Sequence, residues 1–238
     1  MKITEIENKT LPKIKKIEER MSVFIPGINN TIPNRNGNIT VMCGPPGSGK
    51  TNLLMNMFKS TDFYQKKFNN VYLVSPESSF LSITKHPFAD HDKVYFELTE
   101  DLIDGIYDEL LELKKSEKKI QYSCLIIDDF ASDIKQKNIQ SALKRLLVKS
   151  RHVSCSVIFT LQSFNLMPLT LRKLVTNLIL FKPKNNKETE SLNEILNMKQ
   201  DEIHTLLRYG FDELYNFISI DTNSGDIRKN WNLLEIDN

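Results

Sequence analysis

Residues 44–51 read GPPGSGKT and decide the fold of this chain. The segment follows an apolar run, ITVMC at 39–43, and precedes a helical pattern that begins at Lys50. It satisfies the pattern GxxxxGK(S/T) in the strand–loop–helix context where glycines let successive backbone N–H groups turn toward phosphate oxygens. The helix that follows directs its positive N-terminal end at the same place. The sequence therefore predicts a binding site for the phosphates of a nucleoside triphosphate.

The side chains of this loop have separate expected roles. Lys50 supplies positive charge for the β- and γ-phosphates, and Thr51 offers its hydroxyl to Mg²⁺. A chance glycine-rich turn is the alternative, but it does not account for the flanking strand and helix. The predicted nucleotide-binding residues are Gly44, Pro45, Pro46, Gly47, Ser48, Gly49, Lys50, Thr51 and Asn52.

A second motif, CLIIDDF at 124–130, ends an apolar strand in two aspartates. Paired acids at such a place are costly unless cations or a metal compensate them. We expect Asp128 to hold Mg²⁺ through water and Asp129 to orient or deprotonate the attacking water. An aspartate is shorter than the glutamate commonest at this position in ATPases, so Asp129 is the weaker candidate. The alternative for the pair is a turn or N-cap before the next helix.

Polar residues also follow two other predicted strands. Gln162 comes directly after the strand at 156–161, where ligands bind in open α/β sheets. It is a candidate for sensing the γ-phosphate or positioning the water, with a surface amide as the alternative. Ser75 and Glu77 lie at the equivalent end of the strand at 71–75, where a purely structural role is favoured.

Three arginines are candidates for a cation that reaches a neighbouring subunit. Arg145 and Arg151 lie on or just after the helix that precedes the Gln162 strand, and Arg172 follows that strand. A guanidinium that contacts a neighbour's γ-phosphate stabilises transition-state charge as an arginine finger, which requires an oligomer. For each arginine, the alternative is a solvated or DNA-facing cation.

The distribution of apolar runs predicts an α/β domain. Continuous apolar strands separated by amphipathic helices are typical of a parallel sheet covered on both faces. A short extra strand is expected at 94–98, and helices at 100–115, 134–149 and 187–209. The five main predicted strands are 39–43, 71–75, 122–127, 156–161 and 177–181.

The predicted organisation is one P-loop ATPase domain at 39–238 after an N-terminal extension at 1–38. The C-terminal part, 187–238, contains short helices and then a β-hairpin. The turn TNSG at 222–225 separates the two hairpin strands.

Composition excludes several classes of protein. The chain has 238 residues, 40% hydrophobic and 26% charged, which suits a compact globular domain. Its longest apolar runs fall far below the roughly 20 residues that cross a bilayer, and its N-terminus lacks the apolar stretch of a secretory signal. Three cysteines without a CxxC motif indicate neither disulfides nor zinc. We expect their side chains to be buried in the core, and the protein to be found in a reducing compartment.

Charge is unevenly distributed along the chain although the net charge is only +2. Residues 86–130 carry twelve acidic and five basic side chains, whereas 131–190 carry eleven basic and three acidic ones. A local basic surface attracts a polyanion, and a solvated helix face is the equally weighted alternative.

These motifs together resemble the poxvirus-type genome-packaging ATPases of the FtsK/HerA superfamily. The resemblance covers roughly residues 38–235 and depends on GPPGSGKT, CLIIDDF, the segment from Ser150 to Phe181, and the tail FISIDTNSGDIRKNW. It implies a RecA-like sheet with strand order 5-1-4-3-2 and a homo-oligomeric ring, pentameric or hexameric. It also implies the sensor role for Gln162 and makes Arg151 the preferred finger.

The function implied by the resemblance is a motor that drives double-stranded DNA into a preformed capsid. Expected partners are DNA, further copies of the chain, and capsid vertex or membrane-associated packaging proteins. The expected location is the host cytoplasm or viral factory, with the virion as a further location. The loop from Ala131 to Asn138, with Lys135 and Lys137, is the candidate DNA contact.

Other functions stay open at this point. A helicase or a cellular DNA translocase shares the same core motifs, and a nucleotide-dependent assembly or adaptor protein would bind ATP without moving DNA. A GTPase is not indicated, because Thr189 stands where the guanine-reading aspartate of an NKxD motif would be.

Overall fold

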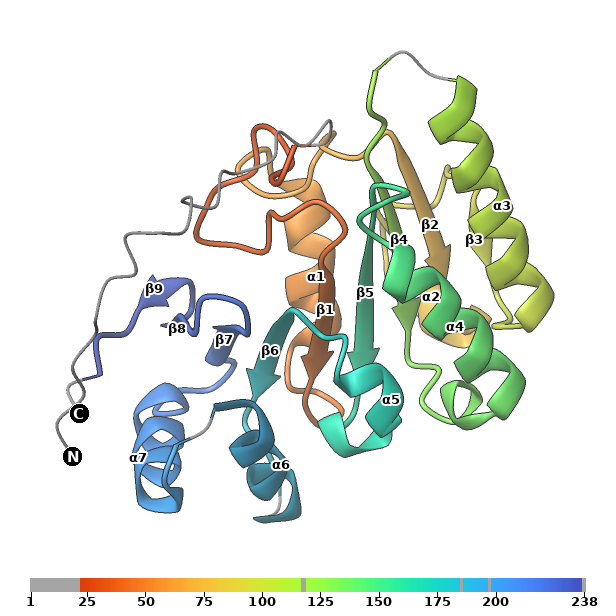
Figure 1. Cartoon of the computed structure of the whole chain (residues 1–238). Helices are drawn as coiled ribbons and strands as arrows, with labels where there is room; N and C mark the ends of the chain where they lie inside the picture. The colour runs from red at the N-terminus through yellow and green to blue at the C-terminus, as the bar shows by residue number, and fades with distance from the viewer. Residues whose placement is uncertain (1–21, 117–118, 185, 197, 237–238) are drawn as a thin grey trace, which may run out of the picture.

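The computed structural model describes residues 22–116, 119–184, 186–196 and 198–236. Within these residues one sheet of nine strands runs in the order β3-β2-β4-β5-β1-β6-β7-β8-β9 (Figure 1). Its strands are β1 (Ile39–Cys43), β2 (Asn70–Val74), β3 (Val94–Tyr95), β4 (Ser123–Asp128), β5 (Cys155–Leu161), β6 (Asn177–Phe181), β7 (Phe217–Asp221), β8 (Ile227–Lys229) and β9 (Asn232–Leu233).

Helices alternate with the strands, as the sequence predicts. Those described are α1 (Lys50–Lys59), α2 (Glu77–Leu81), α3 (Glu100–Ser116), α4 (Lys137–Lys149), α5 (Leu169–Arg172), α6 (Asn186–Leu196), α7 (Gln200–Gly210) and the 3₁₀ helices η1 (Asp133–Lys135) and η2 (Phe164–Leu166).

The predicted strand order is confirmed. The adjacent strands β6-β1-β5-β4-β2 are the fifth, first, fourth, third and second of the five main predicted strands. All four pairs within this set are parallel. Because parallel strands end at one edge, the loops after β1, β4 and β5 meet there (Figure 1). This edge is called the carboxyl edge below.

The extra strand is shorter than the predicted range 94–98. Only Val94 and Tyr95 pair with β2, and the chain then leaves the sheet toward α3. The chain bends at Phe96, and Thr99 then caps α3, where its Oγ1 accepts a hydrogen bond from Leu102 N at 3.1 Å.

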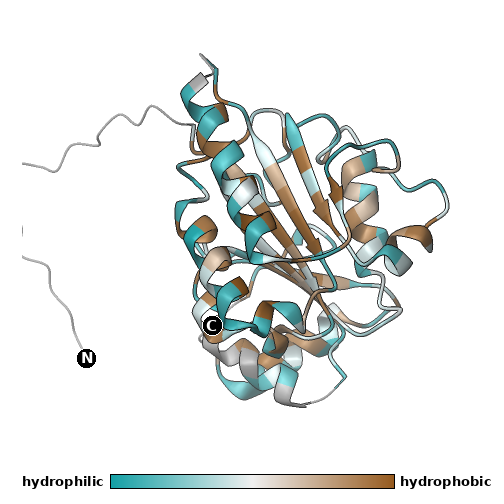
Figure 2. Ribbon diagram, turned by 90° about the vertical axis from the view of Figure 1, so that its right-hand side faces the viewer, coloured by the Kyte–Doolittle hydropathy of each residue, from teal (hydrophilic) through white to brown (hydrophobic). Residues whose placement is uncertain are grey.

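Two apolar layers cover the sheet. On one face of the sheet, the side chains of the central strands pack against α3, α4 and the later helices. On the opposite face, they pack against α1. Figure 2 shows the hydrophobic colour along the strands and hydrophilic colour on the helices around them. The three cysteines lie buried and free inside these layers, as predicted. No helix of the described residues is long and apolar enough to cross a membrane.

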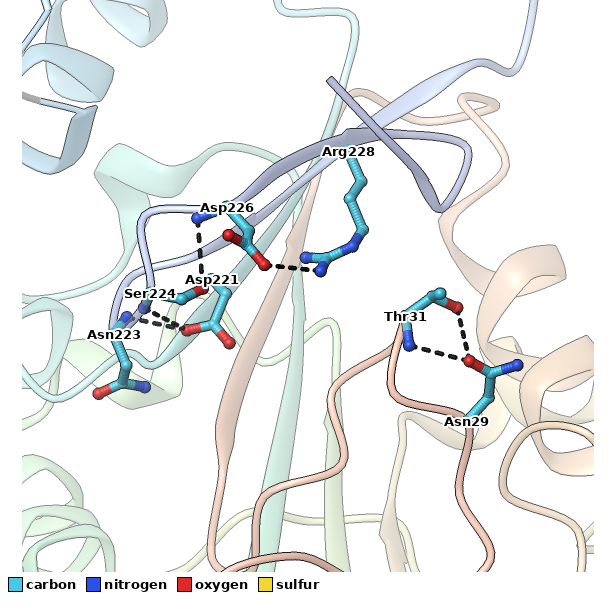
Figure 3. Close-up of polar contacts among 7 residues, drawn as sticks. All are labelled: Asn29, Thr31, Asp221, Asn223, Ser224, Asp226 and Arg228. Atoms are coloured by element: carbon cyan, nitrogen blue, oxygen red, sulfur yellow. Dashed lines mark hydrogen bonds and ion pairs between the residues drawn. The ribbon is translucent and has the colours of Figure 1, made fainter. Parts of the chain in front are cut away.

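The C-terminal hairpin is confirmed and is part of the main sheet. β7 pairs antiparallel with β6, so the sheet continues across it. At the predicted turn, the Asp221 Oδ1 atom accepts hydrogen bonds from the backbone N–H groups of Asn223 at 2.8 Å and Ser224 at 3.3 Å (Figure 3). Beyond it, Arg228 forms an ion pair with Asp226 at 2.7 Å.

The described part of the predicted N-terminal extension, 22–38, packs into the layer that contains α1, while residues 1–21 lie outside the described residues. Ile25, Ile28 and Ile32 are buried there. The Tyr64 hydroxyl donates a hydrogen bond to Pro33 O at 2.7 Å. These contacts make residues 22–38 a part of the hydrophobic core.

Gly37 is the tightest point of this packing and gives a test of it. Its φ is +71°, and a Cβ there would lie 2.4 Å from the Arg151 backbone nitrogen. We expect Gly37→Ala to lower the free energy of unfolding by about 3 kcal/mol, because left-handed strain and overpacking add. Urea denaturation measures this.

Gly225→Ala is the matched control. Gly225 has a φ of +80° with no atom within 4 Å of the added Cβ. It therefore carries the conformational penalty alone, about 1 kcal/mol. Equal destabilisation by both variants would contradict the packing described here.

Candidate nucleotide-binding site

The loop between β1 and α1 has the conformation that its glycines allow. Gly47 and Gly49 have φ values of +78° and +103°, in the left-handed region that disfavours other residues. At Gly44 the constraint is space instead, because a Cβ would lie 2.6 Å from the Cβ of Phe181. The glycines therefore allow both the winding of the loop and its close contact with β6.

Lys50 is the first residue of α1 and points back at the loop. Its Nζ donates hydrogen bonds to Gly44 O at 2.5 Å and to Pro45 O at 3.1 Å. Burial lowers the pKa of this ammonium group, and the nearby Asp129 and Asp128 oppose that effect. The positive charge is thus held at the mouth of the loop, beside the helix N-terminus.

Asp128 ends β4 and is held by two hydroxyl groups, one from β5 and one from the residue that directly follows β2. Its side chain is only 5% exposed. The Thr160 hydroxyl donates a hydrogen bond to Oδ1, and the Ser75 hydroxyl donates one to Oδ2 at 3.1 Å. Both carboxylate oxygens accept hydrogen bonds, which fixes the orientation of the group at the carboxyl edge.

Neither partner of Asp128 is assigned this role from the sequence. Ser75 is a weak candidate there, and Thr160 is only part of a strand. Thr160 lies beside Asp128 because β4 and β5 pair in that register. The strand order and register are needed to find such a contact, since Ser75, Asp128 and Thr160 are far apart along the chain.

Asp129 follows in a left-handed conformation with a φ of +60°. Its backbone N–H donates to Thr160 O at 3.3 Å and to Thr160 Oγ1 at 3.1 Å. An L-residue adopts this conformation rarely, and strained residues of this kind cluster at functional sites. The bend turns the second aspartate away from the strand axis.

A cavity of about 570 Å³ brings together Lys50, Thr51, Asp128, Asp129 and Gln162, which are all of the predicted catalytic and metal-binding residues except Arg151. We name it the carboxylate cavity. Its other walls come from α1 and from the segment around α2, which the sequence does not link to the site. It is lined by Pro46, Gly47, Lys50, Thr51, Asn52, Met55, Asn56, Lys59, Ser79, Ser82, Ile83, Thr84, Asp128, Asp129, Thr160 and Gln162.

The donor atoms of this cavity fit Mg²⁺. Thr51 offers a hydroxyl oxygen and Asp128 an oriented carboxylate, and a hard cation prefers such oxygen ligands together with phosphates and water. Among the described residues, no cluster of three or more His, Cys, Asp or Glu could hold a metal without other ligands. Thr51 and Asp128 would supply two of the oxygen ligands of Mg²⁺, and phosphates and water would supply the others.

The three candidate arginines lie elsewhere in the same chain. Arg151 follows α4 at the opposite edge of the sheet from the loop, before β5 begins. Arg145 forms an ion pair with Asp104 of α3 at 2.6 Å. Arg172 donates from Nε to Met167 O at 2.9 Å. None of them is among the residues that line the carboxylate cavity.

The family of the chain follows from its sequence. Residues 33–209 match the model of the Poxvirus A32 protein family. The chain belongs to this family. The match confirms the family predicted from the motifs. A comparison with curated protein sequences found no match.

Solved structures confirm the fold of the A32-family protein. B204, the DNA-packaging ATPase of Sulfolobus turreted icosahedral virus, is 18% identical, with a TM-score of 0.60 over 84% of this chain and 98% of its own. B204 of Sulfolobus turreted icosahedral virus 2, in complex with AMPPCP, is 21% identical, with a TM-score of 0.56 over 82% and 97%.

A third similar structure comes from outside the viral proteins. The pCW3 conjugation coupling protein TcpA, in its monomer form with ATPγS, is 15% identical to the A32-family protein. Its TM-score is 0.58, over 84% of this chain and 63% of TcpA. At these identities the similarity establishes a shared fold.

The hydrogen bonds to Asp128 give a prediction. Thr160→Val keeps the shape of the side chain but removes the donor to Oδ1. We expect Mn²⁺ binding in the presence of ATP to weaken about tenfold, because partners that orient a metal-binding carboxylate contribute to affinity. Electron paramagnetic resonance titration measures the free metal.

Ser156→Ala is the control on the same strand. The Ser156 hydroxyl is buried and has no hydrogen-bond partner among the described residues, so its removal takes nothing from Asp128. Unchanged Mn²⁺ affinity in Thr160→Val would show that Thr160 does not position the carboxylate.

Proposed function

We propose that this protein is an ATP-hydrolysing motor that translocates double-stranded viral DNA into a preformed capsid. One observation carries the proposal: the phosphate-binding loop and the carboxylates of β4 line a single cavity. Membership in the Poxvirus A32 protein family and the fold shared with the DNA-packaging ATPase B204 support it.

Binding of the triphosphate follows from the loop. Backbone N–H groups of residues 44–51 and the N-terminus of α1 surround the phosphate oxygens. Lys50 exchanges its carbonyl contacts for the β- and γ-phosphates. Thr51 and Asp128 would hold Mg²⁺, which would supply positive charge to the triphosphate.

Hydrolysis uses the second aspartate. A water oxygen forms a bond to the γ-phosphorus as the bond to the bridging oxygen breaks, and ADP leaves with that electron pair. Asp129 accepts the proton of the water, and Gln162 orients it from the end of β5. Both side chains line the carboxylate cavity, so both can reach a γ-phosphate bound there.

Coupling to DNA follows from the loop after β4. Lys135 ends η1 and Lys137 begins α4, and both are exposed. Contacts between lysines and backbone phosphates suit translocation that is independent of sequence. Only five residues separate Asp129 from Lys135, so the proposed base and the proposed DNA contacts lie on one loop.

The active form in this proposal is a ring of identical subunits, pentameric or hexameric. Arg151 lies at the edge of the sheet opposite the loop, so it can complete a site only in a neighbouring subunit. Docking to a capsid vertex or a membrane-associated packaging protein, in the host cytoplasm or viral factory, belongs to the same proposal.

The activity test is Mg²⁺-dependent ATP hydrolysis with and without linear duplex DNA. We expect duplex DNA to stimulate the rate, and rising salt to remove the stimulation because phosphate contacts release counterions. Phosphate release measured by a coupled assay gives both rates. A rate that neither duplex nor single-stranded DNA changes would favour an assembly or adaptor protein instead.

Asp129→Asn tests the proposed base. We expect hydrolysis to fall about 100-fold while ATP affinity stays near that of the parent protein, because the amide retains the shape but accepts no proton. Asp108→Asn is the control, since it removes the same charge from the exposed face of α3. Wild-type hydrolysis in Asp129→Asn would assign the base to another group.

Mixed oligomers test Arg151. Lys50→Ala and Arg151→Ala should each lower hydrolysis at least about 1,000-fold, the scale of a missing arginine finger. Mixing the two inactive proteins should restore part of the activity, because an intact Lys50 of one subunit then meets an intact Arg151 of the next. If the mixture recovers no activity, Arg151 does not act in the site of the neighbouring subunit.

A further inference from the structure

A second cavity, of about 650 Å³, lies on the other side of the loop from the carboxylates. We name it the aromatic cavity. It shares Gly47, Lys50, Thr51, Asn52 and Asn56 with the carboxylate cavity, so the two meet across the N-terminal part of α1. It is lined by Gly47, Gly49, Lys50, Thr51, Asn52, Leu53, Asn56, Phe181, Tyr215 and Phe217.

Aromatic rings from the later strands form the wall of this cavity. Phe181 ends β6 and Phe217 begins β7, with ring centroids 5.8 Å apart. Tyr215 lies against the loop itself: a Cβ on Gly49 would be 3.4 Å from the Tyr215 Cδ1 atom. Yet 61% of Tyr215 is exposed, so much of this residue remains available for a ligand.

The hairpin fixes Tyr215 in this position. Its φ of +67° is in the left-handed region, which an L-residue keeps only when its surroundings impose it. Next to it, the Asn216 Oδ1 atom accepts a hydrogen bond from Asn230 Nδ2 at 2.6 Å, and Phe217 N donates to Asn230 Oδ1 at 3.0 Å. Asn230, which directly follows β8, therefore holds Asn216 and Phe217 in place immediately after Tyr215.

The orientation of the nucleotide follows from the two cavities. The γ-phosphate must lie near Asp128 and Asp129, so the other end of the molecule extends away from them along the N-terminus of α1. That direction leads from the shared residues into the aromatic cavity. Stacking on aromatic rings is a common way to bind the flat face of a base.

We propose that the C-terminal hairpin provides the nucleobase subsite, in which the base stacks on Tyr215. The inference rests on the proposed ATPase function. The amides of Asn52 and Asn56 line the same cavity and offer hydrogen-bonding groups for the edge of the base. In this arrangement the loop binds the phosphates and the hairpin binds the base, and both contribute to the affinity for the nucleotide.

A neighbouring cavity of about 450 Å³ is the competing location for the base. It contains Tyr215 as well, together with Lys182, Lys184 and Leu214. Only Pro46 and Gly47 are common to this cavity and the carboxylate cavity. A nucleotide that contacts Thr51 and Asn52 therefore reaches the aromatic cavity first.

Calorimetric titration of the full chain with ATP and with inorganic tripolyphosphate separates the base from the phosphates. We expect Tyr215→Gly, which suits the left-handed backbone, to weaken ATP binding about tenfold and leave tripolyphosphate binding unchanged. Tyr215→Phe keeps the ring and should bind ATP like the parent protein. Retained tripolyphosphate affinity also shows that the variant is folded.

Other outcomes overturn the proposal in different ways. Unchanged ATP affinity in Tyr215→Gly, or an equal loss for both ligands, would remove the stacking role. Weaker ATP binding in Leu214→Ala would place the base in the neighbouring cavity, because Leu214 lines only that one of the two. A parent protein that binds neither ligand would refute the ATPase function itself.

The only tryptophan of the chain gives a second readout. Trp231 lies edge-on to Phe217, with ring centroids 4.9 Å apart, so it adjoins the aromatic cavity. We expect saturating ATP to change its fluorescence emission, and saturating tripolyphosphate to leave the emission unchanged. Equal changes with the two ligands would contradict a base at this wall.

Discussion

The carboxylate of Asp128, held between Thr160 and Ser75, is the interaction on which the site depends. A buried carboxylate is costly unless both oxygens have partners, and here one partner lies on β5 and the other directly follows β2. The parallel register of β2, β4 and β5 therefore sets the chemistry as well as the sheet. The same register places the bend at Asp129 beside the loop that binds phosphates.

The C-terminal strands extend this arrangement. Because β7 continues the sheet next to β6, Phe181 and Tyr215 lie directly against the glycines of the loop. A Cβ at Gly44 would crowd Phe181, whereas Gly49 is required by its left-handed φ of +103° and leaves the rings of Tyr215 and Phe181 at contact distance. The hairpin is part of the site's wall for this reason, although it follows the loop by more than 160 residues.

Much of this was predictable from the sequence. The clustering of Lys50 with Asp128 follows from two short motifs in their strand and helix contexts. The family was predicted from these motifs together with two longer segments, and the order of the five main strands was implied by that resemblance. The length of β3 was predicted wrongly: of residues 94–98, Val94 and Tyr95 alone pair with β2, although the apolar pattern of the whole run favours a strand. The contact between Asp128 and Ser75 was missed, since periodicity contains no information on which residues of different strands face each other.

The sequence by itself determined the local conformations: a glycine-rich bend, apolar strands that end in acids, and helices with one apolar face. These depend on residues a few positions apart, whose steric and hydrogen-bonding preferences act within one element. Only the tertiary structure decided which hydroxyls hold Asp128, that residues 22–38 complete the core, and that Tyr215 borders the loop. Those contacts join segments distant in the chain, and the packing and register of the whole sheet fix them.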